Sequence, residues 1–185
     1  SVLLAFIAFS LASSSVYILN DYLDRDSDRH HPRKARRPLA CGSAKPVVAL
    51  IIAGLCAIAA LLIAGAVSLN LVLIIATYQA LNAAYSIWLK YIPILDVFSI
   101  SMGFVLRLLA GTTGVGIDPS GWVILCGMMV TLFLGFTKRR TESVFLEQNT
   151  AKNRSVLNQY SGVLLDHLTY ICACASIVTF GLYTV

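Results

Sequence analysis

Residues 46–89 read PVVALIIAGLCAIAALLIAGAVSLNLVLIIATYQALNAAYSIWL and contain no charged side chain. At about 1.5 Å per residue, a helix needs about 20 residues to cross the hydrocarbon core of a bilayer. The stretch is therefore long enough for two crossings, and the polar residues Ser68 and Asn70 mark the turn between them. It predicts a pair of membrane-spanning helices.

The composition of the whole chain agrees with this prediction. Of its 185 residues, 58% are hydrophobic and only 12% are charged, whereas soluble domains carry about a quarter charged residues. The apolar residues are continuous and do not alternate with polar ones, which argues against an outer-membrane β-barrel. We therefore expect an all-α integral membrane protein.

The basic residues divide the rest of the chain into spans. Seven of the 14 Lys and Arg residues lie within residues 25–45, and five lie within residues 138–154. Four crossings are predicted between these two segments, so both lie on one face, which the positive-inside rule assigns to the cytoplasm. Besides the pair within 46–89, spans are predicted at residues 1–19, from the turn at Lys90 to about Gly111, and at residues 122–137 and 166–185, which makes six.

An acidic cluster follows the first span, where residues 20–28 read NDYLDRDSD. With about 100° of rotation per residue, Asp21, Asp24 and Asp28 fall on one stripe of a continuing helix. Asn20 lies beside this stripe. Three carboxylates on one stripe repel one another unless a cation neutralises them, and Mg²⁺ prefers such oxygen ligands. The stripe therefore predicts a Mg²⁺ site made by these acids.

A second interpretation of the stripe stays open, namely a solvated helix end whose acids pair with Arg25 and Arg29. The basic segment that follows also has two interpretations. It suits a substrate with several phosphates. Lys34 and Arg37 are the expected phosphate contacts, because neighbouring prolines restrict the backbone of the loop beside them. A basic cytoplasmic loop needs no ligand, however, since membrane topology alone accounts for it.

These residues resemble the first signature of the UbiA superfamily of intramembrane prenyltransferases, N-D-x-x-D-x-x-x-D followed by R-P-x-x-x-G. The resemblance implies an all-α polytopic transmembrane helical bundle of the UbiA type with about nine spans, of which about six are present. It further implies one membrane domain over residues 1–185, incomplete at both termini. Every position of the signature is matched, by Asn20, Asp21, Asp24, Asp28, Arg37, Pro38 and Gly42.

Later motifs resemble the branch of polyprenyl-phosphate phosphoribosyltransferases, which includes the decaprenyl-phosphate enzymes. They read YSIWLK at residues 85–90, GFVLR at 103–107 and KRRTE at 138–142. The second acidic cluster of the aromatic prenyltransferases is missing from the sequence, and the KRRTE run stands in its place. The resemblance implies that substrate is bound by Lys34, Arg37, Tyr85, Lys90, Arg107, Lys138, Arg139, Arg140 and Glu142.

The function implied by the resemblance is a Mg²⁺-dependent membrane transferase of cell envelope biosynthesis. It moves the 5-phosphoribosyl group from phosphoribosyl diphosphate to a polyprenyl phosphate and releases diphosphate. Its partners are these two substrates and the lipid bilayer, with the active site on the cytoplasmic face of a bacterial plasma membrane. The catalytic residues are Asn20, Asp21, Asp24 and Asp28, of which the three acids bind the metal.

Two alternatives remain open. A UbiA-type enzyme can instead move a prenyl group from prenyl diphosphate to an aromatic acceptor. A more distant alternative is a cation-coupled transporter, although transporter sites usually lie near the bilayer midplane and these acids lie at one face. Nucleic acid is not an expected partner, because the basic segments alternate with membrane spans and not with base-stacking aromatic residues.

Overall fold

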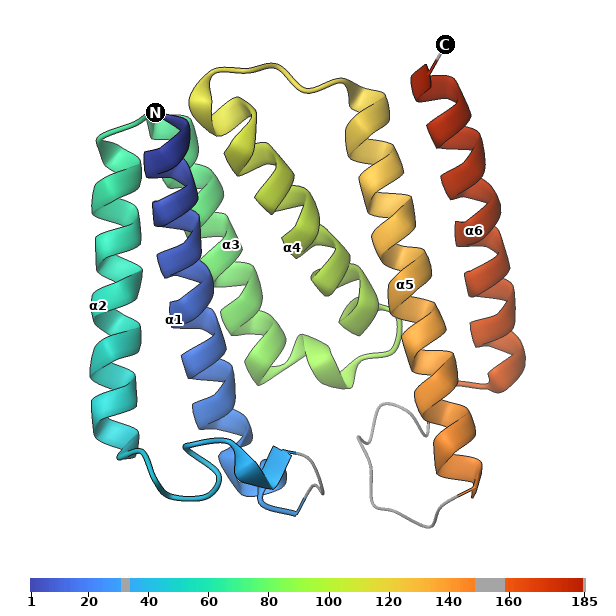
Figure 1. Ribbon diagram of the computed structural model, residues 1–185. Helices are drawn as coiled ribbons and strands as arrows, with labels where there is room; N and C mark the ends of the chain where they lie inside the picture. Colours follow the sequence, from blue (N-terminus) through green and yellow to red (C-terminus); the bar gives the residue numbers. More distant parts are fainter. Residues whose placement is uncertain (31–33, 149–158, 185) are drawn as a thin grey trace. The chain divides into compact units, whose positions relative to one another are not determined.

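The computed structural model describes residues 1–30, 34–148 and 159–184, and every element of regular secondary structure assigned within them is a helix (Figure 1). Six of the described helices, α1 to α6, are long and apolar enough to cross a membrane. The predicted all-α class and the six predicted spans are thereby confirmed. The elements are α1 (Val2–Asp28), η1 (Lys34–Arg36), α2 (Pro46–Gly65), α3 (Leu69–Ile87), η2 (Leu89–Tyr91), α4 (Leu95–Gly111), η3 (Thr113–Val115), α5 (Gly121–Gln148) and α6 (Gly162–Thr184).

Local chemistry explains where several helices begin. Pro46 opens α2, at a position whose backbone N–H would have no partner within the helix. The predicted break at Ser68 is confirmed, because its hydroxyl accepts a hydrogen bond from the N–H of Leu71 (3.1 Å) and caps α3. Ser161 caps α6 in the same way through the N–H of Leu164 (3.1 Å).

The predicted end of the fifth span, Thr137, is wrong as the end of the helix. Helix α5 continues to Gln148, so the KRRTE run lies on a helix and not in a loop. Lys, Arg and Glu are good helix formers, so the end of the apolar segment does not end the helix. The last helix also begins earlier than predicted, at Gly162.

The chain divides into two compact units, which are described separately. The first comprises Ser1–Ile87 and Leu109–Ile117, and in it α1 packs against α2 and α3. Small residues let these helices approach closely. The buried small residues of α1 and α2 are Ala5, Ala8, Ala12, Ser15, Ala53, Ala60 and Ala64.

The second unit comprises Trp88–Leu108 and Asp118–Val185, and α5 and α6 pack together in it. Gly135 of α5 is required for packing against α4, because a Cβ there would collide with Val97. The hydroxyl of Ser101 on α4 lies 2.6 Å from that of Thr131 on α5 and donates to the carbonyl of Met128 (3.1 Å). Polar contacts of this kind join helices that have no hydrophobic driving force between them in lipid.

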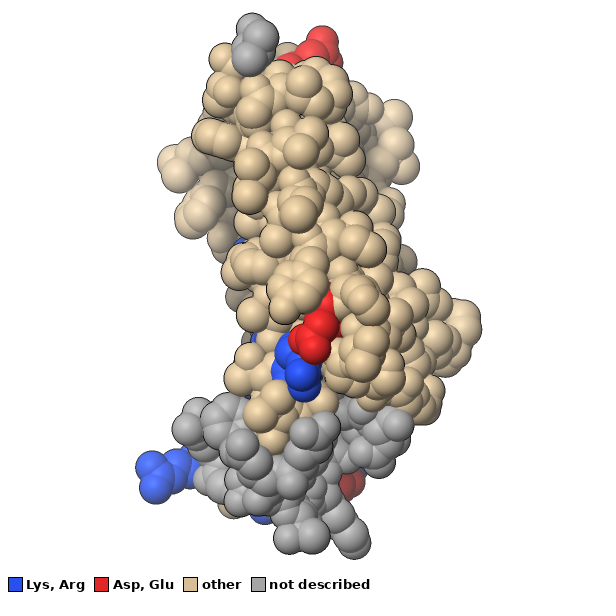
Figure 2. Space-filling model, turned by 90° about the vertical axis from the view of Figure 1, so that its right-hand side faces the viewer, with Lys and Arg blue, Asp and Glu red and all other residues tan. Residues whose placement is uncertain are grey.

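Large apolar side chains cover the outside of the helices. Leu3, Leu62 and Ile177 are each at least 70% exposed, an arrangement that suits contact with lipid and would be unfavourable in water. Figure 2 shows one face on which most of the described surface carries neither acidic nor basic side chains. These surfaces are those of an integral membrane protein.

Candidate functional site

The acidic stripe lies on the last turns of α1, which continues as a helix to Asp28 as the spacing predicted. Asp21 and Asp24 are partly buried, and Asp28 is 3% exposed. The side chain of Asp26 is 71% exposed and faces away from the stripe. A nearly buried carboxylate such as that of Asp28 requires a positive partner or several hydrogen bonds.

That partner is Arg37. Its Nη1 atom donates to Oδ1 of Asp21 (2.7 Å) and to Oδ2 of Asp28 (2.8 Å), so two acids converge on one positively charged nitrogen. Lys34 is more distant, with its Nζ 3.8 Å from Oδ1 of Asp28. The structure thus brings two of the three predicted acids, Asp21 and Asp28, together with both predicted bases of the first loop.

The alternative partners, Arg25 and Arg29, are placed elsewhere. Both form their ion pairs with Asp26, at 3.7 and 3.2 Å respectively. Arg29 also donates from Nε to the carbonyl of Ala40 (3.1 Å), which ties the basic loop to the end of α1. Asp21 and Asp28 are therefore neutralised by the loop that follows α1, while Arg25 and Arg29, in the described part of the chain, pair with Asp26.

Asn20 joins the stripe to α3. Its Nδ2 donates to Oδ2 of Asp24 (3.3 Å), and its Oδ1 accepts from the hydroxyl of Ser86 (3.1 Å). Ser86 is 3% exposed, and sequence reasoning did not select it, although it follows the predicted site residue Tyr85 directly. Asn20 is therefore held in a fixed orientation beside the acids.

The loop after Arg37 needs the glycine of the signature. Gly42 has a φ of 81°, a left-handed conformation that residues with a Cβ rarely adopt. Just before it, Leu39 and Ala40 are buried. The loop is thereby turned back along the end of α1 before α2 begins.

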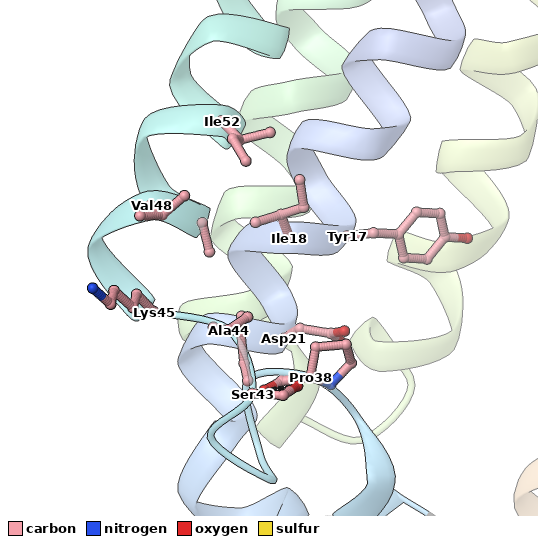
Figure 3. A pocket seen from close by; sticks show the side chains of 11 residues that line it. Tyr17, Ile18, Asp21, Pro38, Ser43, Ala44, Lys45, Val48 and Ile52 are labelled. Carbon is pink, nitrogen blue, oxygen red and sulfur yellow. Dashed lines mark hydrogen bonds between the residues drawn. The ribbon is translucent and has the colours of Figure 1, made fainter.

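A cavity of about 510 Å³ lies beside Asp21, between α1, the loop and the start of α2. Figure 3 shows Asp21 next to Pro38, with Ile18, Val48 and Ile52 on the helices above them. The lining is largely apolar. An apolar recess with one carboxylate at its polar end suits an amphiphilic ligand.

The donor set fits Mg²⁺, since Asp21, Asp24, Asp28 and Asn20 offer the hard oxygen ligands that this ion prefers. Among the described residues, no group of three His, Cys, Asp or Glu side chains is close enough to hold a metal by itself. Mg²⁺ is commonly held by one or two carboxylates together with substrate phosphates. The pair formed by Asp21 and Asp28, which already accepts a cationic nitrogen, meets that requirement.

The second unit contains a buried ionic cluster of its own. Asp96, in the first turn of α4, is fully buried and accepts from Nε of Arg139 (2.7 Å) and from the hydroxyl of Tyr160 (2.6 Å). Arg139, 3% exposed, also donates to Oε2 of Glu142 (2.6 Å). Burial, together with the bond to Asp96, raises the pKa of Tyr160. Tyr160 thus acts as a hydrogen-bond donor to Asp96 at any physiological pH.

Tyr160 also fixes the turn before α4. Its hydroxyl accepts a hydrogen bond from the N–H of Ile94, a β-branched residue with a φ of 70°. Such a residue is rarely found in this conformation, so the surrounding contacts must hold it there. Sequence reasoning missed Tyr160, because nothing local distinguishes it from other tyrosines at a membrane boundary.

The remaining predicted residues of this unit have different surroundings. Arg140 makes a two-pronged ion pair with Asp166, at 2.7 and 3.1 Å. Lys138 is exposed, whereas Lys90 is 6% exposed and lies 5.2 Å from the ring centre of Tyr91. Arg107 is exposed on α4, 5.8 Å from the ring centre of Phe104.

Comparison with known proteins adds an independent finding. Residues 1–185 match the UbiA prenyltransferase family. A decaprenyl-phosphate phosphoribosyltransferase of Mycolicibacterium smegmatis is 37% identical over 98% of this chain and 57% of its own length. The corresponding protein of Mycobacterium tuberculosis is 32% identical over 98% of this chain and 60% of its own. The chain thus spans less than two thirds of the length of these curated relatives.

The fold has a counterpart among solved structures. A UbiA homologue from Archaeoglobus fulgidus, bound to DMAPP and Mg²⁺, superposes with a TM-score of 0.80. The match covers 98% of this chain and 65% of that one, at 18% sequence identity. At this identity the likeness concerns the fold, an all-α membrane bundle.

Proposed function

Because the chain belongs to the UbiA prenyltransferase family, we propose that it transfers the 5-phosphoribosyl group of phosphoribosyl diphosphate to a polyprenyl phosphate, with release of diphosphate. The observation that carries this proposal is the acidic cluster of α1, with Arg37 hydrogen-bonded to two of its carboxylates. A site that combines carboxylates with cationic side chains suits a substrate with several phosphates. Such a site would bind some phosphate oxygens through Mg²⁺ and others directly through Arg and Lys.

The choice of donor rests on two supporting observations. Relatives that match 98% of the chain are named decaprenyl-phosphate phosphoribosyltransferases. The sequence also has no second acidic cluster, which would suit a second metal on a prenyl diphosphate. A phosphoribosyl donor carries an additional 5-phosphate, which a basic side chain such as the exposed Lys138 can bind directly.

The reaction is a substitution at the anomeric carbon of the ribose. An oxygen of the polyprenyl phosphate forms a bond to this carbon while the bond to the diphosphate oxygen breaks, and the bonding electrons leave with diphosphate. A phosphate monoester is already nucleophilic near neutral pH, so no strong general base is required. What the protein must supply is stabilisation of the negative charge that develops on the leaving group.

The first unit supplies this stabilisation through its loop. Lys34 and Arg37 lie against the acidic cluster and provide positive charge where the diphosphate would be held. Asn20, fixed by Ser86, orients Asp24. Asp21 and Asp28, with Asp24 beside them on the stripe, would hold Mg²⁺ together with substrate phosphates, and the ion would make diphosphate a better leaving group by neutralising its charge.

For residues outside the acidic cluster, the proposed roles come from the sequence resemblance. We assign them contacts with substrate phosphate or ribose, and each assignment is a prediction for mutagenesis. Arg139 and Arg140 already form ion pairs with Asp96 and Asp166, so Lys138 is the base of the KRRTE run with the most exposed side chain. The residues assigned in this way are Tyr85, Lys90, Arg107, Lys138, Arg139, Arg140 and Glu142.

A donor assay tests the proposal. Purified protein in detergent receives either labelled phosphoribosyl diphosphate with polyprenyl phosphate, or prenyl diphosphate with an aromatic acceptor, each with Mg²⁺. We expect the ribose label to enter the lipid fraction and no prenylated aromatic product to form. Efficient use of prenyl diphosphate would replace the proposed reaction with aromatic prenylation. Ion flux in liposomes with neither product would instead support a transporter.

The orientation in the membrane is a separate prediction. Helices α2, α3 and α4 and the apolar part of α5 give four crossings between the two basic segments, so we propose that both segments face the cytoplasm. In a variant without native cysteines, the exposed positions Ser43 and Gln159, each changed to Cys, should react with an impermeant thiol reagent only from the cytoplasmic side. Asp118→Cys, in the exposed turn before α5, is the matched control and should react only from outside. Labelling of Ser43→Cys from outside would reverse the topology.

A further inference from the structure

The shared position of Arg37 has a consequence for metal binding. A single atom, Nη1, lies 2.7 Å from Asp21 and 2.8 Å from Asp28, although these acids are two helical turns apart on α1. The two carboxylates are therefore held toward one point. This is the arrangement that a divalent cation requires of them, with a guanidinium in the position of the ion.

Mg²⁺ and the guanidinium compete for the same oxygens. The ion binds carboxylate oxygens at about 2.0–2.1 Å in a nearly ideal octahedron, which leaves no space for a donated N–H on the same lone pairs. The side chain of Asp28 is only 5% exposed, so the site would be strongly unfavourable with neither cation present. Lys34, whose Nζ lies 3.8 Å from Oδ1 of Asp28, is too distant to replace a directly bound cation, so either the guanidinium or the ion is expected to lie against the acids.

The geometry of the loop lets the guanidinium leave without unfolding its backbone. The main chain at Arg37 is fixed by hydrogen bonds from its own N–H to the carbonyl of Lys34 (2.9 Å) and from the N–H of Cys41 to its carbonyl (2.9 Å). The side chain, in contrast, is 37% exposed. Rotation about its side-chain bonds is enough to move the guanidinium away from the acids.

We propose that Arg37 is an exchangeable counter-ion of the acidic cluster. Without metal, it keeps the carboxylates of Asp21 and Asp28 oriented toward a common point. When a divalent ion binds, the guanidinium is released from the acids and becomes available to hold a phosphate oxygen of the metal-bound substrate. Arg37 is in this sense a positioning residue of the metal site. Only the identity of that phosphate rests on the proposed function.

Metal binding to substrate-free protein tests the exchange. Mn²⁺ serves as the probe, and its dissociation constant is measured by electron paramagnetic resonance for the wild type, Arg37→Gln and Arg36→Gln. The control removes the same charge from the adjacent, exposed residue. We expect Arg37→Gln to bind Mn²⁺ at least about tenfold more tightly than the wild type, because removal of a competing charge-assisted hydrogen bond favours the ion by this order. Arg36→Gln should change the affinity less than about threefold, as expected for a screened surface charge.

A second measurement uses the unaltered protein and so does not depend on the folding of a variant. Arginine modification by phenylglyoxal is followed at each site by mass spectrometry, with and without Mg²⁺. We expect modification of Arg37 to become several times faster with Mg²⁺, because its guanidinium leaves the carboxylates, while Arg36 is unaffected.

The outcomes separate the proposal from its rivals. If Mn²⁺ affinity rose equally in both variants, the cause would be general electrostatics. If Arg37→Gln bound Mn²⁺ no more tightly than the wild type, or not at all, the guanidinium would not compete with the ion. Either result overturns the proposed exchange. Slower or unchanged modification of Arg37 with Mg²⁺ also overturns it. Neither measurement uses a substrate, so failure of the donor assay would leave the exchange standing, and failure of the exchange would leave the transferase proposal standing.

Discussion

Asp28→Asn is expected to reduce turnover by about 100-fold or more, because it removes a negative charge that positions the cation at the diphosphate. Asn has nearly the same volume and can still accept one hydrogen bond from Arg37, so the variant should insert and purify normally. The rate is measured at limiting Mg²⁺, where a weakened metal site has its largest effect.

Asp26→Asn is the matched control for this experiment. It removes the same charge from the same helical turn, but its side chain is 71% exposed and points away from the cluster. We expect its activity to lie close to that of the wild type. If Asp28→Asn retained the wild-type rate at limiting Mg²⁺, the assignment of the metal site to this stripe would be wrong.

Asp96→Leu is expected to have the largest effect on stability, a loss of about 3–5 kcal/mol, because it removes the fully buried carboxylate that pairs with the guanidinium of Arg139. The measurement is the apparent melting temperature in detergent. Tyr160→Phe removes the hydrogen bond to the same carboxylate and the one from the N–H of Ile94, and should lose about 2 kcal/mol.

A double variant separates the two causes of this destabilisation. Replacement of a whole buried ion pair by apolar residues is often neutral, whereas removal of one partner is not. Asp96→Leu combined with Arg139→Met should therefore recover most of the stability lost in Asp96→Leu. If the double variant were less stable than the single one, the loss would come from packing around α4 and not from an unpaired charge.

The sequence alone determined the helical class, the six spans and the acidic stripe. These features depend on local patterns: the length of apolar runs, and the rotation of about 100° per residue that places Asp21, Asp24 and Asp28 on one side of a helix. The prolines of the basic segment pointed to Arg37 as well, and the family signature added Gly42. The end of α5 was not predictable from hydropathy, because a helix of Lys, Arg and Glu continues past the membrane boundary.

Only the tertiary structure decided which charges are partners. Asp96 pairs with Arg139, which lies 43 residues away, and no local pattern in the sequence indicates this partner. Ser86 reaches Asn20 from 66 positions along the chain. Arg37 pairs with Asp28 and with the more distant Asp21, whereas the exposed Asp26, which lies between them in the sequence, pairs with Arg25 and Arg29. The local sequence around a charged side chain or a hydroxyl does not identify its partner. The pairing is set by how the helices pack and by which carboxylates are removed from solvent.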